Sequence, residues 1–231
     1  MTNLDLEIVS LCAGIYQYQG DVQVVWDHFD DGTDDEVCWA LKHFDDHDAI
    51  IFRGSSDLQD WIIDFRAYPV ITSFGTVHDG FHVGLDKVWQ EIKPMLRNPV
   101  VLGGHSLGAG RVSPMAAIMK KDGVAPIARY TFGEPKPGFQ DLADYIVSVP
   151  GKNYRNGDGK EHHDLITDLP FTITNLGLDY VHPLPMTDVV ADPTITMIAA
   201  WGLFSFHHIW LYRQALGGPN PPADLKGMKN G

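Results

Sequence analysis

The chain has 231 residues, of which 44% are hydrophobic and 20% are charged, and 17 Lys and Arg against 30 Asp and Glu give a net charge of −13. This composition is typical of a folded globular protein and excludes a chain that is disordered throughout. The acidic balance argues against nucleic-acid partners and against electrostatic docking on anionic lipid, because both need clustered Lys and Arg. It leaves a transient apolar contact with a lipid interface open.

The first predicted element is a helix, because Leu4, Ile8 and Cys12 recur every four residues. Apolar residues then alternate over 22–26 and again over 37–41, and a turn rich in Asp and Gly lies between the two runs. This pattern predicts an antiparallel hairpin at the N-terminal edge of a sheet.

From residue 49 onward, short apolar runs alternate with helical patterns. Buried strands are expected over 49–52, 100–103 and 128–132, and helices over 57–67, 85–96 and 107–121. Such alternation predicts an α/β fold with a mostly parallel central sheet and helices on both of its faces. Pro114 lies within the last of these helices and is expected to kink it or to end it early.

The middle of the chain carries no linker pattern, so we expect one domain over residues 1–231 with an irregular Gly- and Pro-rich tail over 217–231. Neither a signal peptide nor a membrane span is recognisable. This favours a soluble protein, cytoplasmic or secreted without a visible signal peptide. Cys12 and Cys38 both lie in apolar runs and are predicted to be buried free thiols, with a disulfide as the alternative.

The segment 99–110 carries the clearest chemical signal. It contains Gly104-His105-Ser106-Leu107-Gly108, a G-x-S-x-G pattern between a predicted buried strand and a predicted helix. A sharp turn at this point presents the Ser106 hydroxyl as a nucleophile, and the flanking glycines avoid collisions with neighbouring elements. The amide of Leu107 lies at the helix N-terminus, where it can stabilise an oxyanion. We interpret His105 as a packing residue.

A serine nucleophile needs a base, and the base needs an orienting carboxylate. On a fold of this type the chain order is serine, acid, histidine. Of the eleven histidines, this order leaves His182, His207 and His208 as candidate bases.

Five motifs in the same chain together resemble the class 3 lipases of the α/β-hydrolase fold, over about residues 49–212. They are IFRGS at 51–55 with DW at 60–61, VHDGF at 77–81, GHSLGA at 104–109, TFGEPKPG at 131–138 and DLITDLP at 164–170. The resemblance implies a carboxylic ester hydrolase, a lipase or esterase, that works through an acyl-enzyme.

The resemblance also implies roles for individual residues. Asp164 is placed as the triad acid, and Ser55 as an oxyanion-hole donor beside Leu107. A late H-x-[IL]-x-x-Y pattern selects His207 as the base ahead of the two other candidates. The family pattern by itself does not identify which aspartate is the triad acid, because extra residues separate the preceding R-x-x-N segment from Asp164.

Asp158 is therefore an alternative acid. It lies in the turn-forming string at 156–159, where an aspartate has a sufficient structural reason to cap its own backbone. Asp164 begins a segment that Leu165 and Ile166 can anchor in the core. We favour Asp164, because a mobile carboxylate cannot hold the tautomer of an imidazole.

Three apolar residues after the predicted oxyanion residue, Trp61, Ile62 and Phe65, form either a lid or acyl pocket, as in the family, or the core face of their helix. The acidic cluster at 45–48 matches neither EF-hand nor zinc spacing and is predicted to be a solvated loop, so we expect no metal. No phosphate-binding or dinucleotide-binding glycine loop is recognisable, so we expect no organic cofactor.

The predicted function is hydrolysis of acyl esters or acylglycerols, with a small-molecule ester or lipid as substrate. The short segment after Ser55 and the charge of −13 favour short to medium acyl chains. Two alternatives stay open: a feruloyl esterase or phospholipase on the same triad, and a catalytically idle α/β-hydrolase used for binding. The sequence does not indicate an oligomeric state.

Overall fold

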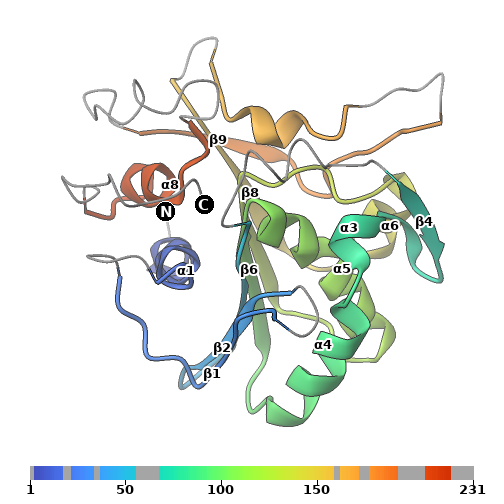
Figure 1. Cartoon of the computed structure of the whole chain (residues 1–231), viewed down its shortest axis with the longest axis horizontal. Helices are drawn as coiled ribbons and strands as arrows, with labels where there is room; N and C mark the ends of the chain where they lie inside the picture. Colours follow the sequence, from blue (N-terminus) through green and yellow to red (C-terminus); the bar gives the residue numbers. More distant parts are fainter. Residues whose placement is uncertain are drawn as a thin grey trace.

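The computed structural model describes residues 3–17, 22–33, 37–55, 68–158, 162–171, 177–191 and 206–219. Within these residues a seven-stranded sheet has the order β1-β2-β3-β6-β7-β8-β9 (Figure 1). The strands are β1 (His28–Asp30), β2 (Trp39–His43), β3 (Asp48–Phe52), β6 (Val100–His105), β7 (Ala128–Phe132), β8 (Gly151–Gly157) and β9 (Met186–Val190). All pairs from β3 to β9 are parallel, and β1 and β2 form an antiparallel edge. The predicted mostly parallel sheet with an N-terminal hairpin is confirmed.

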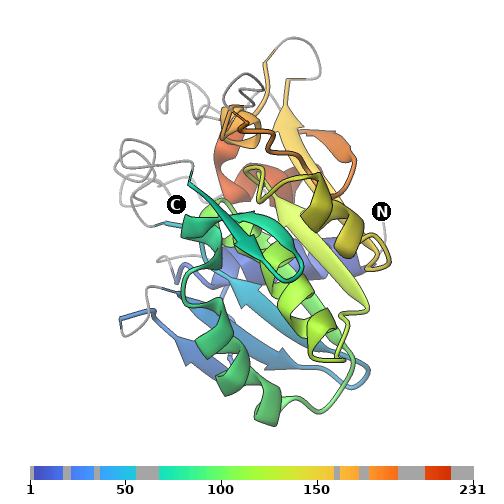
Figure 2. The same ribbon diagram turned by 90° about the vertical axis from the view of Figure 1, so that its right-hand side faces the viewer.

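Helices cover both faces of the sheet, as predicted. The helices α1 (Asn3–Gly14) and α8 (Ile209–Ala215) lie side by side on one face (Figure 1). The opposite face carries α3 (Asp79–His82), α4 (Leu85–Ile92), α5 (Leu107–Lys121) and α6 (Gln140–Tyr145), with a second hairpin of β4 (Pro69–Thr72) and β5 (Gly75–His78) (Figure 2). Two short 3-10 helices, η1 (Lys93–Met95) and η2 (Leu165–Asp168), complete the described elements. Each face of the sheet has its own apolar core.

The first strand of the N-terminal hairpin differs from the prediction. Residues 22–26 form no strand, and β1 begins at His28, two residues beyond the predicted end. The alternation nevertheless has a physical cause. Val22, Val24 and Trp26 pack against the core under the sheet, while the intervening side chains face solvent. One-sided burial of an extended segment therefore produced a strand-like pattern without a strand.

The helix that contains Pro114 also differs from the prediction, because α5 runs without interruption from Leu107 to Lys121. A proline removes one backbone donor, but residues 108–119 are buried between the sheet and neighbouring helices. The packing around α5 therefore outweighs the free energy lost with that backbone hydrogen bond. The helix predicted over 85–96 ends earlier, at Ile92, and continues as η1.

Both cysteines are free and buried, which confirms the prediction of two thiols and excludes the disulfide. Burial raises the pKa of the Cys38 thiol to about 11 and the pKa of Cys12 further still. The predicted helix over 57–67 and most of the predicted tail lie outside the described residues. Among the described helices, none is both long and apolar enough to cross a membrane.

Candidate active site

Ser106 lies at the junction of β6 and α5 in a strained backbone conformation. Its φ of 59° and ψ of −131° fall in a region that non-glycine residues rarely adopt. The turn is held because the Ser106 amide donates to the Phe132 carbonyl at 3.1 Å and the Ser106 carbonyl accepts from the Gly110 amide at 3.2 Å. The side chain is 1% exposed at the carboxyl-terminal edge of the parallel strands. This is the sharp strand-to-helix turn that the G-x-S-x-G pattern predicts.

The glycines that flank Ser106 leave no room for side chains. A Cβ at Gly104 would lie 2.5 Å from the Gly108 carbonyl oxygen, and a Cβ at Gly108 would overlap the carbonyl oxygen of Phe52 at the end of β3. The predicted collisions with neighbouring elements are therefore confirmed. Close approach of these backbones is what brings the end of β3 against the turn.

Asp164 and His207 form a buried pair at the same edge of the sheet. The His207 Nδ1 lies 2.6 Å from Asp164 Oδ2, and the two side chains are 1% and 0% exposed. The same Oδ2 accepts a hydrogen bond from the Tyr212 hydroxyl at 2.6 Å, and Oδ1 accepts from the Ile166 amide at 3.0 Å. Burial, followed by the nearby charge of Asp164, raises the pKa of Tyr212 well above its usual value, so its hydroxyl remains a donor. The carboxylate is thus held at both oxygens. Of the two residues expected to anchor its segment in the core, Ile166 is buried as predicted, whereas Leu165 is exposed, so the prediction is wrong for Leu165.

The alternative acid and the alternative bases have other partners. Asp158 accepts from His162 Nδ1 at 2.7 Å near the surface. The His208 Nδ1 accepts from the Trp210 amide at the start of α8, and burial, aided by the charge of His207, lowers the pKa of His208 to about 3.

His182 Nε2 contacts the Thr167 carbonyl oxygen at 2.8 Å. The structure therefore brings Asp164 and His207 together and leaves His182, like Asp158 and His208, in separate interactions. Within the described residues, the Ser106 hydroxyl and the His207 Nε2 are both buried and have no hydrogen-bond partner. These are the two groups that a serine–histidine pair would join.

Two residues shape the pair although sequence reasoning gave them no role. Gly133 has φ +61°, and a Cβ there would lie 2.6 Å from Asp164 Oδ2 and 2.8 Å from His207 Nδ1. Tyr212 donates to the carboxylate from α8. Both stand inside motifs that are visible in the sequence, the TFG string and the late H-x-[IL]-x-x-Y pattern. Their place in these motifs could have drawn attention to both residues, but their contacts with Asp164 form only when distant segments of the chain come together.

Of the predicted oxyanion residues, Leu107 directly follows Ser106, and Ser55 follows a glycine that packs against it. A Cβ on Gly54 would be 2.8 Å from the Ser106 Cβ, so the backbone just before Ser55 packs against the turn. Leu107 is the first residue of the 15-residue helix α5, whose N-terminal amides and dipole favour negative charge. Trp61, Ile62 and Phe65 lie outside the described residues, so neither interpretation of them is tested.

The acidic cluster at 45–48 lies at the opposite end of the sheet. The prediction of a solvated loop is correct for Asp45 and Asp46, which are exposed, and wrong for His47 and Asp48, which are buried. Asp48 is buried because its carboxylate accepts the amides of residues 97 and 98 at 2.7 and 3.0 Å.

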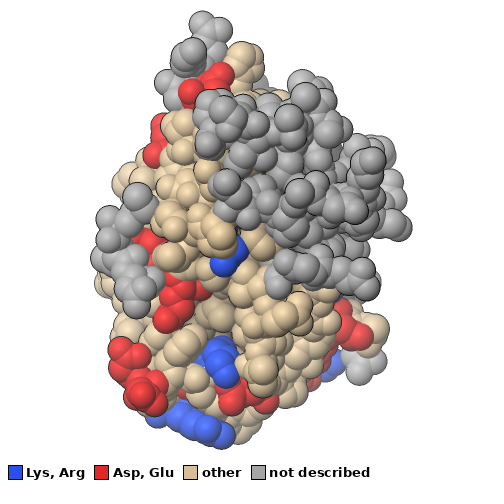
Figure 3. Space-filling model, turned by 90° about the vertical axis from the view of Figure 1, so that its left-hand side faces the viewer, with Lys and Arg blue, Asp and Glu red and all other residues tan. Residues whose placement is uncertain are grey.

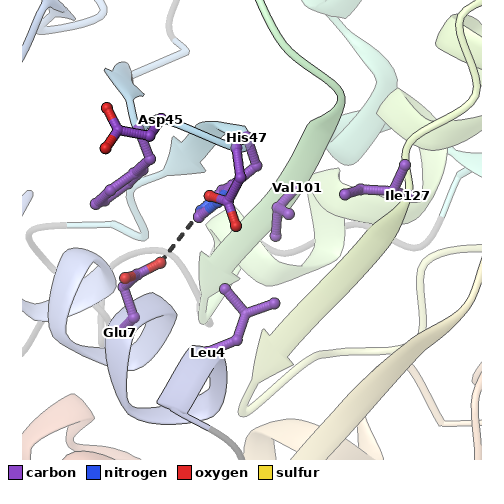
Figure 4. A pocket seen from close by; sticks show the side chains of 8 residues that line it. Leu4, Glu7, Asp45, His47, Val101 and Ile127 are labelled. Atoms are coloured by element: carbon purple, nitrogen blue, oxygen red, sulfur yellow. Dashed lines mark hydrogen bonds and ion pairs between the residues drawn. The ribbon is translucent and has the colours of Figure 1, made fainter.

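A cavity of about 600 Å³ opens beside this cluster, with His47 Nε2 pointing at Glu7 Oε1 at 3.1 Å (Figure 4). Its lining residues are Leu4, Glu7, Phe44, Asp45, Asp46, His47, Val101 and Ile127. Since these residues surround the amino ends of β3, β6 and β7, the cavity is remote from Ser106. Among the described residues, no group of three or more His, Cys, Asp or Glu side chains is arranged to hold a metal.

The charged side chains on the described part of the α1 face are mostly acidic (Figure 3). On the described part of that face, acidic groups predominate and Lys and Arg lie scattered among them (Figure 3). This distribution agrees with the net charge of −13. Attraction of an anionic surface to this part of the face is therefore not favoured.

Comparison with known proteins gives a consistent picture. A profile of the family described as lipase (class 3) matches residues 49–174, more than half of the chain. The secreted mono- and diacylglycerol lipase 1 of Fusarium solani is 30% identical over 125 residues, 49% of this chain and 37% of that protein. A lipase of Rhizomucor miehei is 31% identical over 150 residues, 57% of this chain and 40% of that protein. The chain thus spans about two fifths of the length of these relatives.

Solved structures share the fold. The triacylglyceride lipase of Rhizomucor miehei aligns with a TM-score of 0.60 at 22% identity, over 83% of this chain and 82% of that one. A mutant of MDLA from Penicillium cyclopium aligns with a TM-score of 0.64 at 18% identity, over 84% and 83% of the two chains. The architecture is that of the fungal lipases, an α/β-hydrolase fold, as predicted.

Proposed function

The chain belongs to the class 3 lipase family, and from this premise we propose that it is a serine carboxylic-ester hydrolase. The observation that carries the proposal is the buried His207–Asp164 hydrogen bond of 2.6 Å at the sheet edge that also holds Ser106 in its strained turn. In this proposal Ser106 is the nucleophile, His207 the general base and Asp164 the orienting acid.

The reaction proceeds in two halves. The His207 Nε2 takes the proton of Ser106 as the oxygen attacks the ester carbonyl, and the resulting imidazolium gives that proton to the leaving alcohol. Water, activated by the same imidazole, then hydrolyses the acyl-enzyme and restores Ser106. Asp164 holds the Nδ1–H tautomer and stabilises the imidazolium, since its two oxygens are already fixed by Tyr212 and Ile166.

The oxyanion that forms in each half is bound by the Leu107 amide and by Ser55. The amide contributes the positive end of the α5 dipole, and Ser55 follows a segment that packs against the Ser106 side chain. Removal of one such donor typically costs about 100-fold to 1,000-fold in kcat.

Acyl esters and acylglycerols are the proposed substrates. Support comes from the relatives, whose names describe lipases that act on mono-, di- and triacylglycerols. Short to medium acyl chains are favoured by the charge of −13, which does not assist adsorption to anionic lipid. Leu165, which follows the acid in the chain, and Phe171, which follows the motif at 164–170, are exposed apolar side chains available for transient contact with a lipid interface. Secretion is the favoured location, because two relatives are named as secreted.

The direct test is hydrolysis of p-nitrophenyl butyrate combined with labelling by a serine-directed phosphonate. The wild type should hydrolyse the ester and take up one label, and Ser106→Ala should lose both activities. Ser73→Ala, at an exposed turn, is the matched control and should retain both. A wild-type protein that neither hydrolyses the ester nor takes up the label contradicts the proposal and leaves the binding-only alternative.

The substrate preference is tested by comparing turnover rates on a set of different esters. We expect faster turnover of C4 than of C16 esters, and faster turnover of tributyrin than of methyl ferulate or phosphatidylcholine. Faster C16 hydrolysis that rises above the solubility limit contradicts the chain-length proposal. Faster turnover of the ferulate or the phospholipid replaces the acylglycerol proposal with the corresponding alternative.

A further inference from the structure

His105, the residue before the nucleophile, is buried and fully bonded, yet the mechanism above gives it no task. Its Nδ1 lies 2.8 Å from the Tyr16 hydroxyl, and its Nε2 lies 2.7 Å from the backbone carbonyl oxygen of His207. The His105 and His207 rings are stacked, with centroids 4.7 Å apart and planes inclined by 28°. A side chain expected only to pack thus contacts the proposed base through both its ring and its nitrogen.

The proton positions on this ring follow from its partners. A carbonyl oxygen can only accept, so Nε2 carries a hydrogen and donates it to His207. Burial, followed by the neighbouring His207, lowers the pKa of His105 well below its usual value, so the ring is neutral. Nδ1 must then be an acceptor, and the Tyr16 hydroxyl must donate to it. One tautomer of His105 is therefore selected by the two contacts.

Tyr16 extends the same network to residues 53–55, the oxyanion loop that contains the proposed donor Ser55. Its hydroxyl oxygen accepts a hydrogen bond from the Gly54 amide at 3.2 Å, and Gly54 immediately precedes Ser55. The contact is close, since a Cβ on Gly54 would lie 2.5 Å from that hydroxyl. Tyr16 follows α1 and His207 precedes α8, and these helices lie side by side on one face of the sheet (Figure 1).

We infer that Tyr16 and His105 are positioning residues that hold the oxyanion loop and the base His207 in register with Ser106. The chain of bonds runs from the Gly54 amide to the Tyr16 hydroxyl, from that hydroxyl to His105 Nδ1, and from His105 Nε2 to the His207 carbonyl. This inference rests on the proposed function, because it assigns a purpose to the alignment of that same site.

The neutral state of His105 supports this positioning role. When His207 becomes an imidazolium during the reaction, a neutral ring stacked on it offers no opposing charge, whereas a second cation at 4.7 Å would repel it. The network has its effect in the transition state, where the oxyanion and the imidazolium must both be aligned. A small displacement of either group is enough to cost about 100-fold in rate.

The test uses Tyr16→Phe, which removes only the hydroxyl, with Tyr154→Phe as the matched control. Tyr154 is a buried tyrosine in the same apolar core that stacks on Phe132, and its hydroxyl is associated with Asp5 and Lys152. For p-nitrophenyl butyrate we expect Tyr16→Phe to lower kcat about tenfold, with KM within about twofold of wild type. Tyr154→Phe should leave both constants unchanged. Rates are expressed per phosphonate-reactive Ser106, so a loss of folded protein alone does not change kcat.

Two His105 variants separate the contacts. Glutamine retains a donor at the position of Nε2, whereas phenylalanine retains the stacked ring and loses both nitrogens. We expect His105→Phe to lower kcat about 100-fold and His105→Gln about tenfold. Equal loss in the two variants contradicts the role of the His207 carbonyl bond. If either variant fails to fold, Tyr16→Phe still decides the inference.

A nuclear magnetic resonance measurement is independent of activity. Long-range nitrogen spectra of the wild type should show His105 protonated at Nε2 and not at Nδ1. Tyr16→Phe should keep this tautomer, because the His207 carbonyl still requires a donor, and should shift the Nδ1 resonance as the bond to the hydroxyl is lost. A wild-type His105 protonated at Nδ1 contradicts the network whether or not the protein hydrolyses esters. An active wild type with an unchanged kcat in Tyr16→Phe overturns the inference and leaves the proposed function intact. An inactive, unlabelled wild type refutes the function instead.

Discussion

The two ends of the parallel sheet each carry a histidine–carboxylate pair, fully buried at the carboxyl end and partly buried at the amino end, and the two pairs differ in what surrounds them. At the amino end His43 Nδ1 lies 2.7 Å from Asp48 Oδ1, and at the carboxyl end His207 Nδ1 lies 2.6 Å from Asp164 Oδ2. The length of the hydrogen bond does not distinguish them. The pair at the carboxyl end lies beside the strained turn of Ser106 and leaves Nε2 without a partner among the described residues.

The pair at the amino end has a structural task. Asp48 Oδ2 accepts the backbone amides of Arg97 and Asn98, which fastens the connection before β6 to the start of β3. A short His–Asp hydrogen bond is therefore insufficient to indicate catalysis. The position at the carboxyl edge of the strands, next to Ser106 in its strained turn, is what gives the second pair its proposed role.

The largest contrast is expected from replacing the two carboxylates by amides. Asp164→Asn should lower kcat about 10,000-fold, since an amide favours the wrong tautomer of His207. Asp48→Asn should leave kcat per active site near wild type and lower the free energy of unfolding by about 2 kcal/mol, because its bonds to backbone amides weaken. Ester hydrolysis and urea unfolding of both variants check this, with Asp158→Asn as the control for the alternative acid. A large rate loss in Asp158→Asn transfers the acid role.

A smaller effect is expected from crowding the carboxyl-end pair. Gly133→Ala would place a methyl group 2.6 Å from Asp164 Oδ2 and should lower kcat about 100-fold by displacing that carboxylate from His207. Gly123→Ala is the control, since Gly123 has a similar positive φ of +80° and open space around it. It should show only the backbone strain, about 1 kcal/mol in unfolding free energy, and a normal kcat. Equal kcat in both variants means that Gly133 does not support the pair.

The smallest effect concerns stability in acid. Burial lowers the pKa of His208 to about 3, whereas an unfolded histidine titrates near 6.5. Above pH 6.5 both states are neutral, so stability is unaffected. Below it the unfolded chain takes up a proton that the folded protein refuses, so unfolding free energy falls by about 1.4 kcal/mol per pH unit for this residue.

Urea unfolding between pH 7 and pH 5 measures this slope. His208→Gln should reduce the slope by about one proton. An identical slope in His208→Gln and wild type would show that His208 is protonated in the folded protein.

Local patterns predicted the nucleophile region well, because its geometry is local. The glycines at 104 and 108 are required by contacts within one strand–turn–helix unit, and those contacts are present. The strand at 49–52 was likewise readable as a short apolar run, because it is fully buried.

Tertiary contacts explain what the sequence did not reveal. The alternation over 22–26 reports burial on one side, and a strand also needs a partner, which no local pattern encodes. Pro114 is tolerated within α5 because the packed surroundings outweigh a lost hydrogen bond. Tyr212 and Gly133 meet Asp164 only after three distant segments come together.

The most direct test of the proposed triad is the rate of phosphonate labelling in the wild type, His207→Ala and His208→Ala, with the labelled residue located by peptide mass spectrometry. The account predicts a label on Ser106 in the wild type, a rate lowered by several orders of magnitude in His207→Ala, and a rate close to wild type in His208→Ala. A label on another serine, or undiminished labelling of Ser106 without His207, would contradict it.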